Sequence, residues 1–431
     1  MILFKLTGKL VDVETAFLHG DIDVEIYMDC PPGLDAEPDE CVQLNHTIYG
    51  LVQSARQFFK KLEKCMKDLG YVPSEVDPCL LVKRGTKNEI AFVAIYVDDC
   101  LFIGDENLIQ ETIKGIIKWG LEVKVTDDLS DYLSCRILFN NDRSKAWLGQ
   151  PHLIKKIREK MGDLVKNLQT YRTPGTPNQG IRRMKDEDLE EHKLDAEQHA
   201  FYRSGVGMLL YLVKHSRPDI ANPVRELSKV LDRPNMAAMK ELKRITKFVL
   251  DTADHGLKIE PQKMVGSQWV LKVYTDSDWA GDKDSRISVS GYVLFLMNVP
   301  ILWRSKSQRA IALSSSEAEY YALGEAAKDI KFAHMLLTTM GLPVKLPIIV
   351  HVDNIGAIFM TENISTSGRT KHLDLRARYV NKMVTDGFLK FEFVRSGNNL
   401  ADYLTKNVPG DIYASHVTSF IADKSTITDK Q

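Results

Sequence analysis

Acidic residues stand at a few defined points of an otherwise apolar pattern. The pair Asp98-Asp99 interrupts the apolar run from Ile95 to Ile103, and Asp12 follows another short apolar stretch. Burying carboxylates at such points is costly unless another group compensates their charge. Two carboxylates about 4 Å apart repel by roughly 4 kcal/mol at an effective dielectric constant of about 20. We therefore expect divalent cations here, and two such ions together form a phosphoryl-transfer site.

A second set of acids lies in the C-terminal part of the chain, each at the expected end of a strand or helix: Asp276, Glu319, Asp353 and Asp402. Local explanations compete with a metal site at each position. Asp276 could close a turn, and Glu319 could form a capping box with Ser316. Asp353 could be a helix N-cap, and Asp402 could favour a first helical turn. For Asp12, Asp98 and Asp99 taken singly, turn formation is the ordinary explanation. The neighbours Asp278 and Glu317 are assigned supporting or solvent roles.

Apolar periodicity predicts the elements that would position these acids. A mixed α+β domain is expected over 1–165, with a strand ending at residue 13, a helix over 54–69 and a hairpin over 90–103. A linker or mobile loop is expected over 166–200, because that segment is rich in Pro and Gly and then in charge. A helical module is expected over 201–265, an α/β domain over 266–410 and a weakly structured tail over 411–431. Within the α/β domain, strands are expected over 270–274, 291–296, 348–352 and 389–394, and helices over 317–337 and 355–360.

Composition limits the class of protein. Apolar residues make up 44% of the 431 residues and charged residues 27%, as in folded soluble proteins. The net charge of −1 gives no bulk indication of nucleic-acid binding. The six cysteines lie in the first third without Cys-x-x-Cys spacing, which argues against a zinc site and a disulfide framework. With no apolar run long enough to span a bilayer, we expect no membrane partner and a cytoplasmic or nuclear location.

Five segments of the N-terminal part resemble the reverse transcriptase of copia-type retrotransposons. They are Asp12 to Asp21, Glu25 to Met28, Pro31 to Gly33, Tyr49 to Arg56, and Tyr96 to Asp99. The resemblance implies that Asp12 and Asp98 bind two magnesium ions and that Asp99 supports the site. It also implies that Phe17 blocks a ribose 2′-hydroxyl and that Gln53 lines the pocket of the incoming nucleotide. A core role for Phe17 and a helix-capping role for Gln53 are the alternatives.

The C-terminal part resembles the ribonuclease H of the same elements. The matching segments are Tyr274 to Gly281, Ser314 to Leu323, and Asn399 to Lys406. The resemblance implies that Asp276, Glu319, Asp353 and Asp402 hold two Mg²⁺ ions, with Mn²⁺ as an alternative. His372, in a further family motif, would move a proton or contact phosphate, unless it belongs to a surface His-Asp-Arg cluster. The implied fold is a palm with an antiparallel sheet, a helical thumb or connection, and an α/β ribonuclease H-like domain with a mixed sheet.

The implied enzyme is an RNA-directed DNA polymerase and ribonuclease H. It would copy an RNA template from a DNA primer with dNTPs and degrade RNA in an RNA–DNA hybrid. The chain begins about ten residues before Asp12, so we expect the fingers to be missing and nuclease activity to exceed polymerase activity. Residues 132–137 depart from the family pattern, in which a Gly-containing strand follows the catalytic hairpin, and this leaves primer positioning by the segment open. The alternative is a catalytically inactive remnant that only binds nucleic acid. A different two-metal enzyme is disfavoured because both motif sets occur in this order. The sequence leaves the oligomeric state open.

Overall fold

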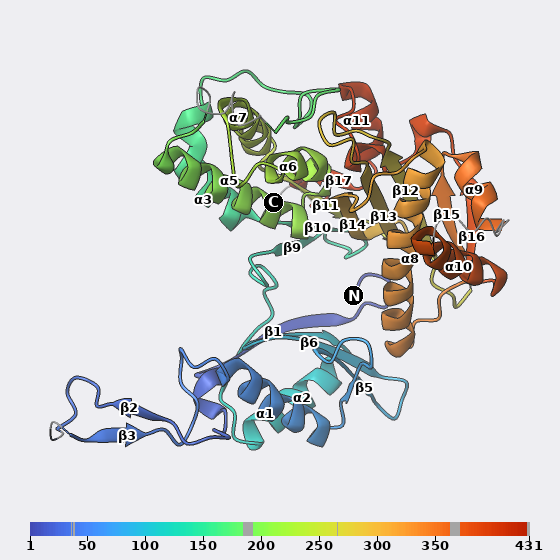
Figure 1. Ribbon diagram of the computed structural model, residues 1–431. Coiled ribbons are helices and arrows are strands. Elements are labelled where there is room, and N and C mark those ends of the chain that lie inside the picture. The colour runs from blue at the N-terminus through green and yellow to red at the C-terminus, as the bar shows by residue number, and fades with distance from the viewer. Residues whose placement is uncertain (36, 38, 184–192, 265, 363–370, 429–431) are drawn as a thin grey trace. The chain divides into compact units, whose positions relative to one another are not determined.

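The structure is a computed structural model that describes residues 1–35, 37, 39–183, 193–264, 266–362 and 371–428 (Figure 1). The chain divides into two compact units, Met1–Tyr132 and Leu133–Gln431. The division falls earlier than the boundary predicted near residue 165. The reason is helix α3 (Pro151–Val165), which packs its apolar face into the core of the second unit.

The first unit is built on an antiparallel sheet with strand order β4-β5-β6-β7-β1-β8. Its strands are β1 (Thr7–Val13), β4 (Val72–Pro73), β5 (Leu80–Arg84), β6 (Ile90–Tyr96), β7 (Asp99–Gly104) and β8 (Val123–Thr126). The predicted hairpin is confirmed as β6 and β7. β1 is distant in sequence but pairs with β7 in the middle of the sheet, so both predicted acidic segments share one sheet.

Helices α1 (Ser54–Asp68) and α2 (Glu106–Lys118) cover one face of this sheet (Figure 1). Along α1, Phe58, Leu62, Cys65 and Met66 recur at helical spacing, and all four are buried. The helix predicted over 54–69 is therefore confirmed. A short 3-10 helix η1 (Ala16–His19) follows β1, and a separate hairpin pairs β2 (Tyr27–Asp29) with β3 (Cys41–Gln43).

The second unit begins with a sheet of order β17-β11-β10-β9, packed with a group of helices. Its elements are β9 (Arg136–Phe139), β10 (Ala146–Gly149), α3, α5 (Ala196–His215), η2 (Pro218–Ile220), α6 (Ala221–Ser228), α7 (Met236–Asp251), β11 (His255–Ile259) and β17 (Ile421–Asp423). The prediction of a weakly structured tail is wrong for the described residues up to 428. Helix α11 (Gly410–Val417) buries Tyr413 in this core, and β17 pairs with β11. The 3-10 helix η5 (Lys424–Thr426) follows.

The predicted linker also has fixed contacts in its described part, residues 166–183 and 193–200. The Thr176 hydroxyl donates to Glu241 Oε1 at 2.7 Å, and the Ile181 N–H donates to Glu226 Oε2 at 2.7 Å. Ile181 is buried with the helical core. Acids on α6 and α7 thus bind this segment, which composition alone marks as a loop. The charge-rich residues 184–192 lie outside the described part of the chain.

The rest of the second unit is a mixed sheet of order β14-β13-β12-β15-β16 with helices. Its elements are β12 (Leu271–Asp278), β13 (Val289–Leu296), β14 (Val299–Ser307), α8 (Ser315–Thr339), β15 (Ile348–Val352), α9 (Ile355–Glu362), α10 (Lys371–Thr385), β16 (Leu389–Phe393), η3 (Ser396–Asn398) and η4 (Asp402–Leu404). β12 pairs antiparallel with β13 and parallel with β15. The predicted mixed α+β class is confirmed.

Strand β13 joins the two cores of the second unit. Tyr292 and Leu294 pack with α8 on one face of the sheet, whereas Val293 and Phe295 pack with the connecting helices on the other. A strand buried on both faces has a continuous apolar sequence rather than an alternating one. The helical module and the mixed sheet therefore share one folded unit. Among the described helices, none is both long and apolar enough to cross a membrane.

Candidate active sites

The first predicted group, Asp12, Asp98 and Asp99, comes together at one end of the β1–β7 pair. Asp12 and Asp99 are direct cross-strand partners, and the Val13 N–H donates to the Asp98 carbonyl oxygen at 3.2 Å. All three aspartates are half-buried. Burial, followed by the charges of Asp98 and Asp12, raises the pKa of Asp99 above its usual value. The two sequence motifs, one with Asp12 and one with Asp98 and Asp99, thus bring their carboxylates together at one site.

A strained turn holds this group in place. Val97 and Asp98 form the connection between β6 and β7, and Val97 has φ of +60°. A β-branched residue adopts this left-handed backbone only at a cost. The turn places the two aspartates at the strand end opposite Asp12.

Phe17 and Gln53, the residues predicted to contact the nucleotide, both lie in the first unit. Phe17 sits on η1, half-buried, with its ring centroid 4.8 Å from that of Tyr49. The fully buried Thr47 hydroxyl donates to the Phe17 carbonyl oxygen and fixes the backbone. Phe17 is therefore not a fully enclosed core residue. Gln53 occupies the N-cap position of α1, but its side chain makes no capping hydrogen bond.

The second predicted group forms a compact centre, which we call the acidic cluster: Asp276, Glu319, Asp353 and Asp402. Asp276, Asp353 and Asp402 each offer a carboxylate oxygen, and these atoms all lie within 4.8 Å of one another. Among the described residues, only these three satisfy that distance for a metal-holding group. Asp276, Glu319 and Asp402 are buried, and Asp353 is half-buried.

Sheet geometry explains why Asp276 and Asp353 meet. Tyr274 on β12 pairs with His351 on the parallel strand β15, so the residues two further on lie at equivalent positions. Asp276 lies within β12 rather than in a turn, and Asp353 directly follows β15. The helix-capping alternative for Asp353 is not supported, because Asn354 Oδ1 accepts the Ala357 N–H at 2.9 Å.

Glu319 reaches the cluster from α8. Its Oε1 accepts from the Ser277 N–H at 2.9 Å and from the Ser277 hydroxyl at 3.0 Å, while its buried Oε2 has no hydrogen-bond partner. The capping-box alternative with Ser316 is wrong, since the N-cap of α8 is Ser314, whose hydroxyl accepts the Glu317 N–H. An unpartnered buried carboxylate oxygen is costly without a cation. It fits the donor set of a hard divalent ion.

Supporting residues that sequence reasoning left without a role hold the remaining acids. The Thr405 hydroxyl donates to Asp276 Oδ2 and also lies 3.0 Å from the Asp402 carbonyl oxygen. The buried Asn399 amide donates to the Thr275 carbonyl oxygen at 2.8 Å and accepts the Ala401 N–H. Asn399 therefore joins β12 to the segment that carries Asp402. Among such supporting residues, only Lys406 had a local signal in the sequence: it stands four residues after Asp402, a spacing typical of ion pairs on a helix.

Burial and mutual repulsion raise the pKa values of carboxyl groups in the acidic cluster. Burial and then the charge of Asp402 raise the pKa of Asp276 to about 7. Burial, Asp276 and Asp353 raise the pKa of Glu319 well above its usual value. Burial also raises the pKa of Asp402, although Lys406 opposes this change. Perturbed carboxyls of this kind are typical of functional centres.

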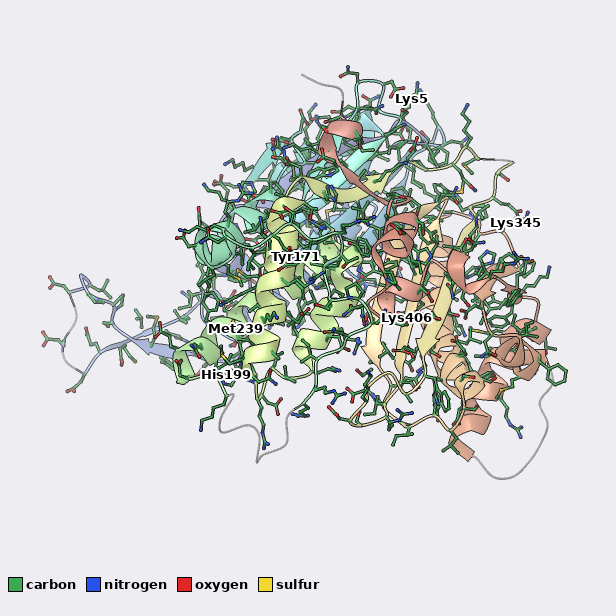
Figure 2. All side chains as sticks on the ribbon, turned by 90° about the horizontal axis from the view of Figure 1, so that it is seen from above. Lys5, Tyr171, His199, Met239, Lys345 and Lys406 are labelled. Carbon is green, nitrogen blue, oxygen red and sulfur yellow. The ribbon has the colours of Figure 1, made fainter. Side chains whose placement is uncertain are left out.

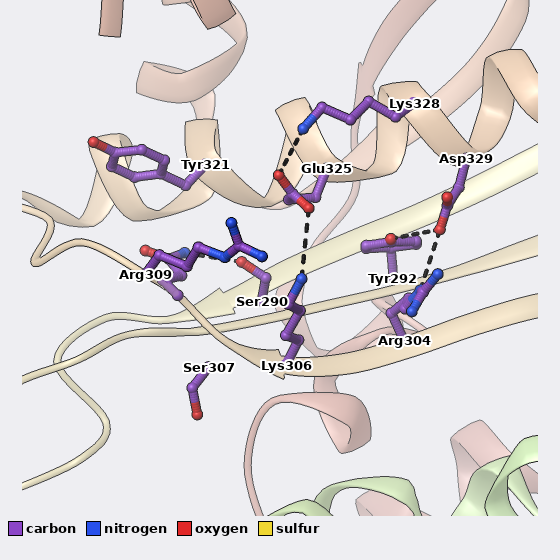
Figure 3. A pocket seen from close by; sticks show the side chains of 11 residues that line it. Ser290, Tyr292, Arg304, Lys306, Ser307, Arg309, Tyr321, Glu325, Lys328 and Asp329 are labelled. Carbon is purple, nitrogen blue, oxygen red and sulfur yellow. Dashed lines mark hydrogen bonds and ion pairs between the residues drawn. The ribbon is translucent and has the colours of Figure 1, made fainter. Parts of the chain in front are cut away.

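Two features remain, the predicted residue His372 and a cavity beside the mixed sheet. His372 falls in α10, and its side chain lies outside the described part of the structure. A cavity of about 220 Å³ lies between β13, β14 and α8 (Figure 3). Its acids have basic partners: Glu325 lies 3.0 Å from Lys328, and Asp329 lies 3.3 Å from Arg304. No predicted site residue lines this cavity.

Comparison with known proteins identifies the family of this chain. Residues 7–176 match the family described as reverse transcriptase (RNA-dependent DNA polymerase). The retrovirus-related Pol polyprotein from transposon TNT 1-94 of Nicotiana tabacum is 33% identical over 406 residues, which are 94% of this chain and 30% of that protein. The chain belongs to the copia-type retrotransposon Pol polyproteins. The Pol polyprotein from transposon RE2 of Arabidopsis thaliana is 31% identical over 402 residues, covering 92% of this chain and 26% of that protein.

The copia-type chain thus spans about a third or less of these two relatives. A solved structure of the N-terminal RNase H domain of rv2228c from Mycobacterium tuberculosis aligns with 35% of this chain and 96% of that chain, at 16% identity and a TM-score of 0.22. The prediction of a copia-type Pol fragment is confirmed by the sequence relatives. The reverse transcriptase match continues past Tyr132 into the second unit, as far as the segment bound by Glu241.

Proposed function

We propose that this copia-type chain cleaves the RNA strand of an RNA–DNA hybrid at the acidic cluster and extends a DNA primer on an RNA template at Asp12, Asp98 and Asp99. The observation that carries the proposal is the approach of carboxylate oxygens from Asp276, Asp353 and Asp402 to within 4.8 Å of one another. Folding does not require such an arrangement, because three acids in a largely buried place destabilise the protein without counter-charge.

The donor set of the acidic cluster fits Mg²⁺, with Mn²⁺ as the alternative, two ions per site. All of its ligands are carboxylate oxygens, which hard divalent ions prefer. When bound, such ions activate water and stabilise the charge that develops on a phosphate. Glu319 Oε2, buried and without a hydrogen-bond partner, gives the cluster a free acceptor for such an ion.

The chain's own residues would keep the acids in position for this chemistry. Ser277 occupies one oxygen of Glu319 and leaves the other free. Thr405 orients Asp276, and Asn399 fixes the segment that carries Asp402 against β12. Preorganised groups of this kind need little rearrangement on reaction. We further propose that His372 moves a proton or contacts phosphate there.

The polymerase assignment depends on the same logic in the first unit. Asp12 and Asp99 are cross-strand partners, and Asp98 adjoins them. We propose that these three hold metal for the attack of a primer 3′-hydroxyl on a dNTP. Phe17, half-buried against Tyr49, would discriminate against a ribose 2′-hydroxyl. The side chain of Gln53, which makes no capping hydrogen bond to α1, would contact the incoming nucleotide.

The test is cleavage of a labelled RNA strand in an RNA–DNA hybrid by the full chain, with and without Mg²⁺. Asp276→Asn combined with Asp353→Asn removes two ligands, and Asp284→Asn, an exposed acid outside the cluster, is the matched control. We expect Mg²⁺-dependent cleavage by the parent and the control, and a loss of at least about 100-fold in the double variant. If the parent cleaves no hybrid while still binding it, the inactive remnant is the better description.

A further inference from the structure

Lys406 places a positive charge at the edge of the acidic cluster. Its Nζ lies 3.0 Å from Asp402 Oδ1, and its side chain is 44% exposed. Lys406 lies between the connecting helices and the mixed sheet (Figure 2). Paired with a carboxylate, the side chain is an ammonium ion at neutral pH.

The negative charge of this centre does not balance the ammonium and two divalent metal ions together. Asp276, Glu319, Asp353 and Asp402 carry at most four negative charges, which two divalent ions neutralise completely. A fifth positive charge on Asp402 would be repelled by the ions and would occupy a carboxylate that they need.

We propose that Lys406 is a resident counter-charge that binds Asp402 while no divalent ion is present and is displaced when metal binds. The proposal depends on the metal site of the proposed function and adds a control of its affinity. Lys406 then makes metal binding weaker than the carboxylates alone would allow, and it keeps the metal-free cluster folded.

The surroundings of Lys406 allow such a displacement. A cavity of about 840 Å³ opens beside it and is lined by polar groups, among them Asn222, Asn407 and Asp278. Asp278 also attracts the ammonium. A lysine has a flexible stem, and nearly half of this side chain faces solvent. Lys406 can thus leave Asp402 without losing all of its polar contacts.

The experiment is calorimetric titration of Mg²⁺ into the full chain and into Lys406→Gln. Displacement gives up the attraction between two unit charges 3.0 Å apart, which corresponds to about tenfold in affinity even at the dielectric constant of water. We therefore expect Kd for Mg²⁺ to fall about tenfold or more in Lys406→Gln. Lys240→Gln is the control, because Lys240 lines the same cavity from α7 without contacting the cluster, and its Kd should stay within about twofold of the parent value.

Thermal unfolding gives a second readout. Without metal, Lys406→Gln should unfold at a lower temperature than the parent, and added Mg²⁺ should raise its midpoint by more than it raises that of the parent. An unchanged or higher Kd in Lys406→Gln overturns the counter-charge role while leaving the metal site intact. If neither protein binds Mg²⁺ above the level of Asp276→Asn combined with Asp353→Asn, both the metal site and this proposal fail.

Discussion

Replacing Asp276 by Asn should stabilise the metal-free protein at neutral and alkaline pH. Asp276 is 2% exposed, and its pKa is raised from 3.8 to about 7, chiefly by burial and then by Asp402. A rise of that size corresponds to about 4 kcal/mol of unfolding free energy when the group is ionised in both states. Asn keeps an acceptor for the Thr405 hydroxyl and carries no charge. Allowing for relaxation of its neighbours, we expect a gain of about 2 to 4 kcal/mol.

The pH dependence of this gain has a definite sign. Between the unfolded and the folded pKa, the folded state holds a proton on Asp276 that the unfolded state has released. The stability of the parent therefore falls as pH rises from about 4 to about 7 and is lowest above that range. The advantage of Asp276→Asn should be small near pH 4, grow through this window and stay constant at pH 8.

Urea unfolding followed by tryptophan fluorescence measures this effect, since Trp279 lies on the segment that follows β12. EDTA keeps the protein free of metal, and Asp284→Asn, which removes an exposed charge, should change stability by less than about 0.5 kcal/mol. With Mg²⁺ present the order should reverse, because only the parent retains the full ligand set. An Asp276→Asn protein no more stable than the parent at pH 8 in EDTA would refute the reasoning.

Other features of the chain give further predictions. Val97→Gly relieves the left-handed backbone at the turn and should raise the unfolding free energy of the first unit by about 1 kcal/mol, measured by urea unfolding with Trp119 as the probe. Arg217→Met should lower stability by about 3 to 5 kcal/mol, because it removes both hydrogen bonds from the guanidinium to the fully buried Asp219 carboxylate. Adding Asp219→Leu should recover part of that loss in the same assay, since it removes the buried charge but leaves the Tyr413 hydroxyl without its acceptor. Asn399→Ala should cost about 1 to 3 kcal/mol in chemical unfolding, since the Thr275 carbonyl oxygen and the Ala401 N–H lose their partner, and a cost below about 0.5 kcal/mol would contradict this role.

The sequence predicted best those elements whose local pattern agrees with their final surroundings. The helix over 54–69 buries the residues that its spacing selects, and the strand over 348–352 has the bounds expected for it. β14 (Val299–Ser307) was not predicted. It contains Pro300 and ends in the continuous polar run Arg304 to Ser307. It forms an edge of the sheet, where proline is tolerated.

The segments predicted as linker and tail show what local composition cannot supply. The run from Thr173 to Gly180 has the composition of a loop, yet Glu241 and Glu226 on distant helices bind it and the residue that follows. Helix α11 begins at Gly410 and has a weak apolar pattern, but Tyr413 packs against Phe248 and donates to the buried Asp219. These partners lie far away in the sequence, so their identity depends on the tertiary fold.

The acidic cluster combines both kinds of information. Because β12 and β15 are parallel neighbours, acids at equivalent positions must meet at one edge of the sheet, and their places after apolar runs together with the family resemblance selected Asp276 and Asp353. Lys406 stands four residues after Asp402, and the structure pairs the two side chains, although no role was predicted for Lys406 from the sequence. What this spacing could not give is that this pair faces Asp276, so that a single ammonium acts on the whole cluster. The same lysine that neutralises Asp402 must then compete with any cation the cluster binds, and stability without metal and affinity for metal should change in opposite directions when Lys406 is replaced.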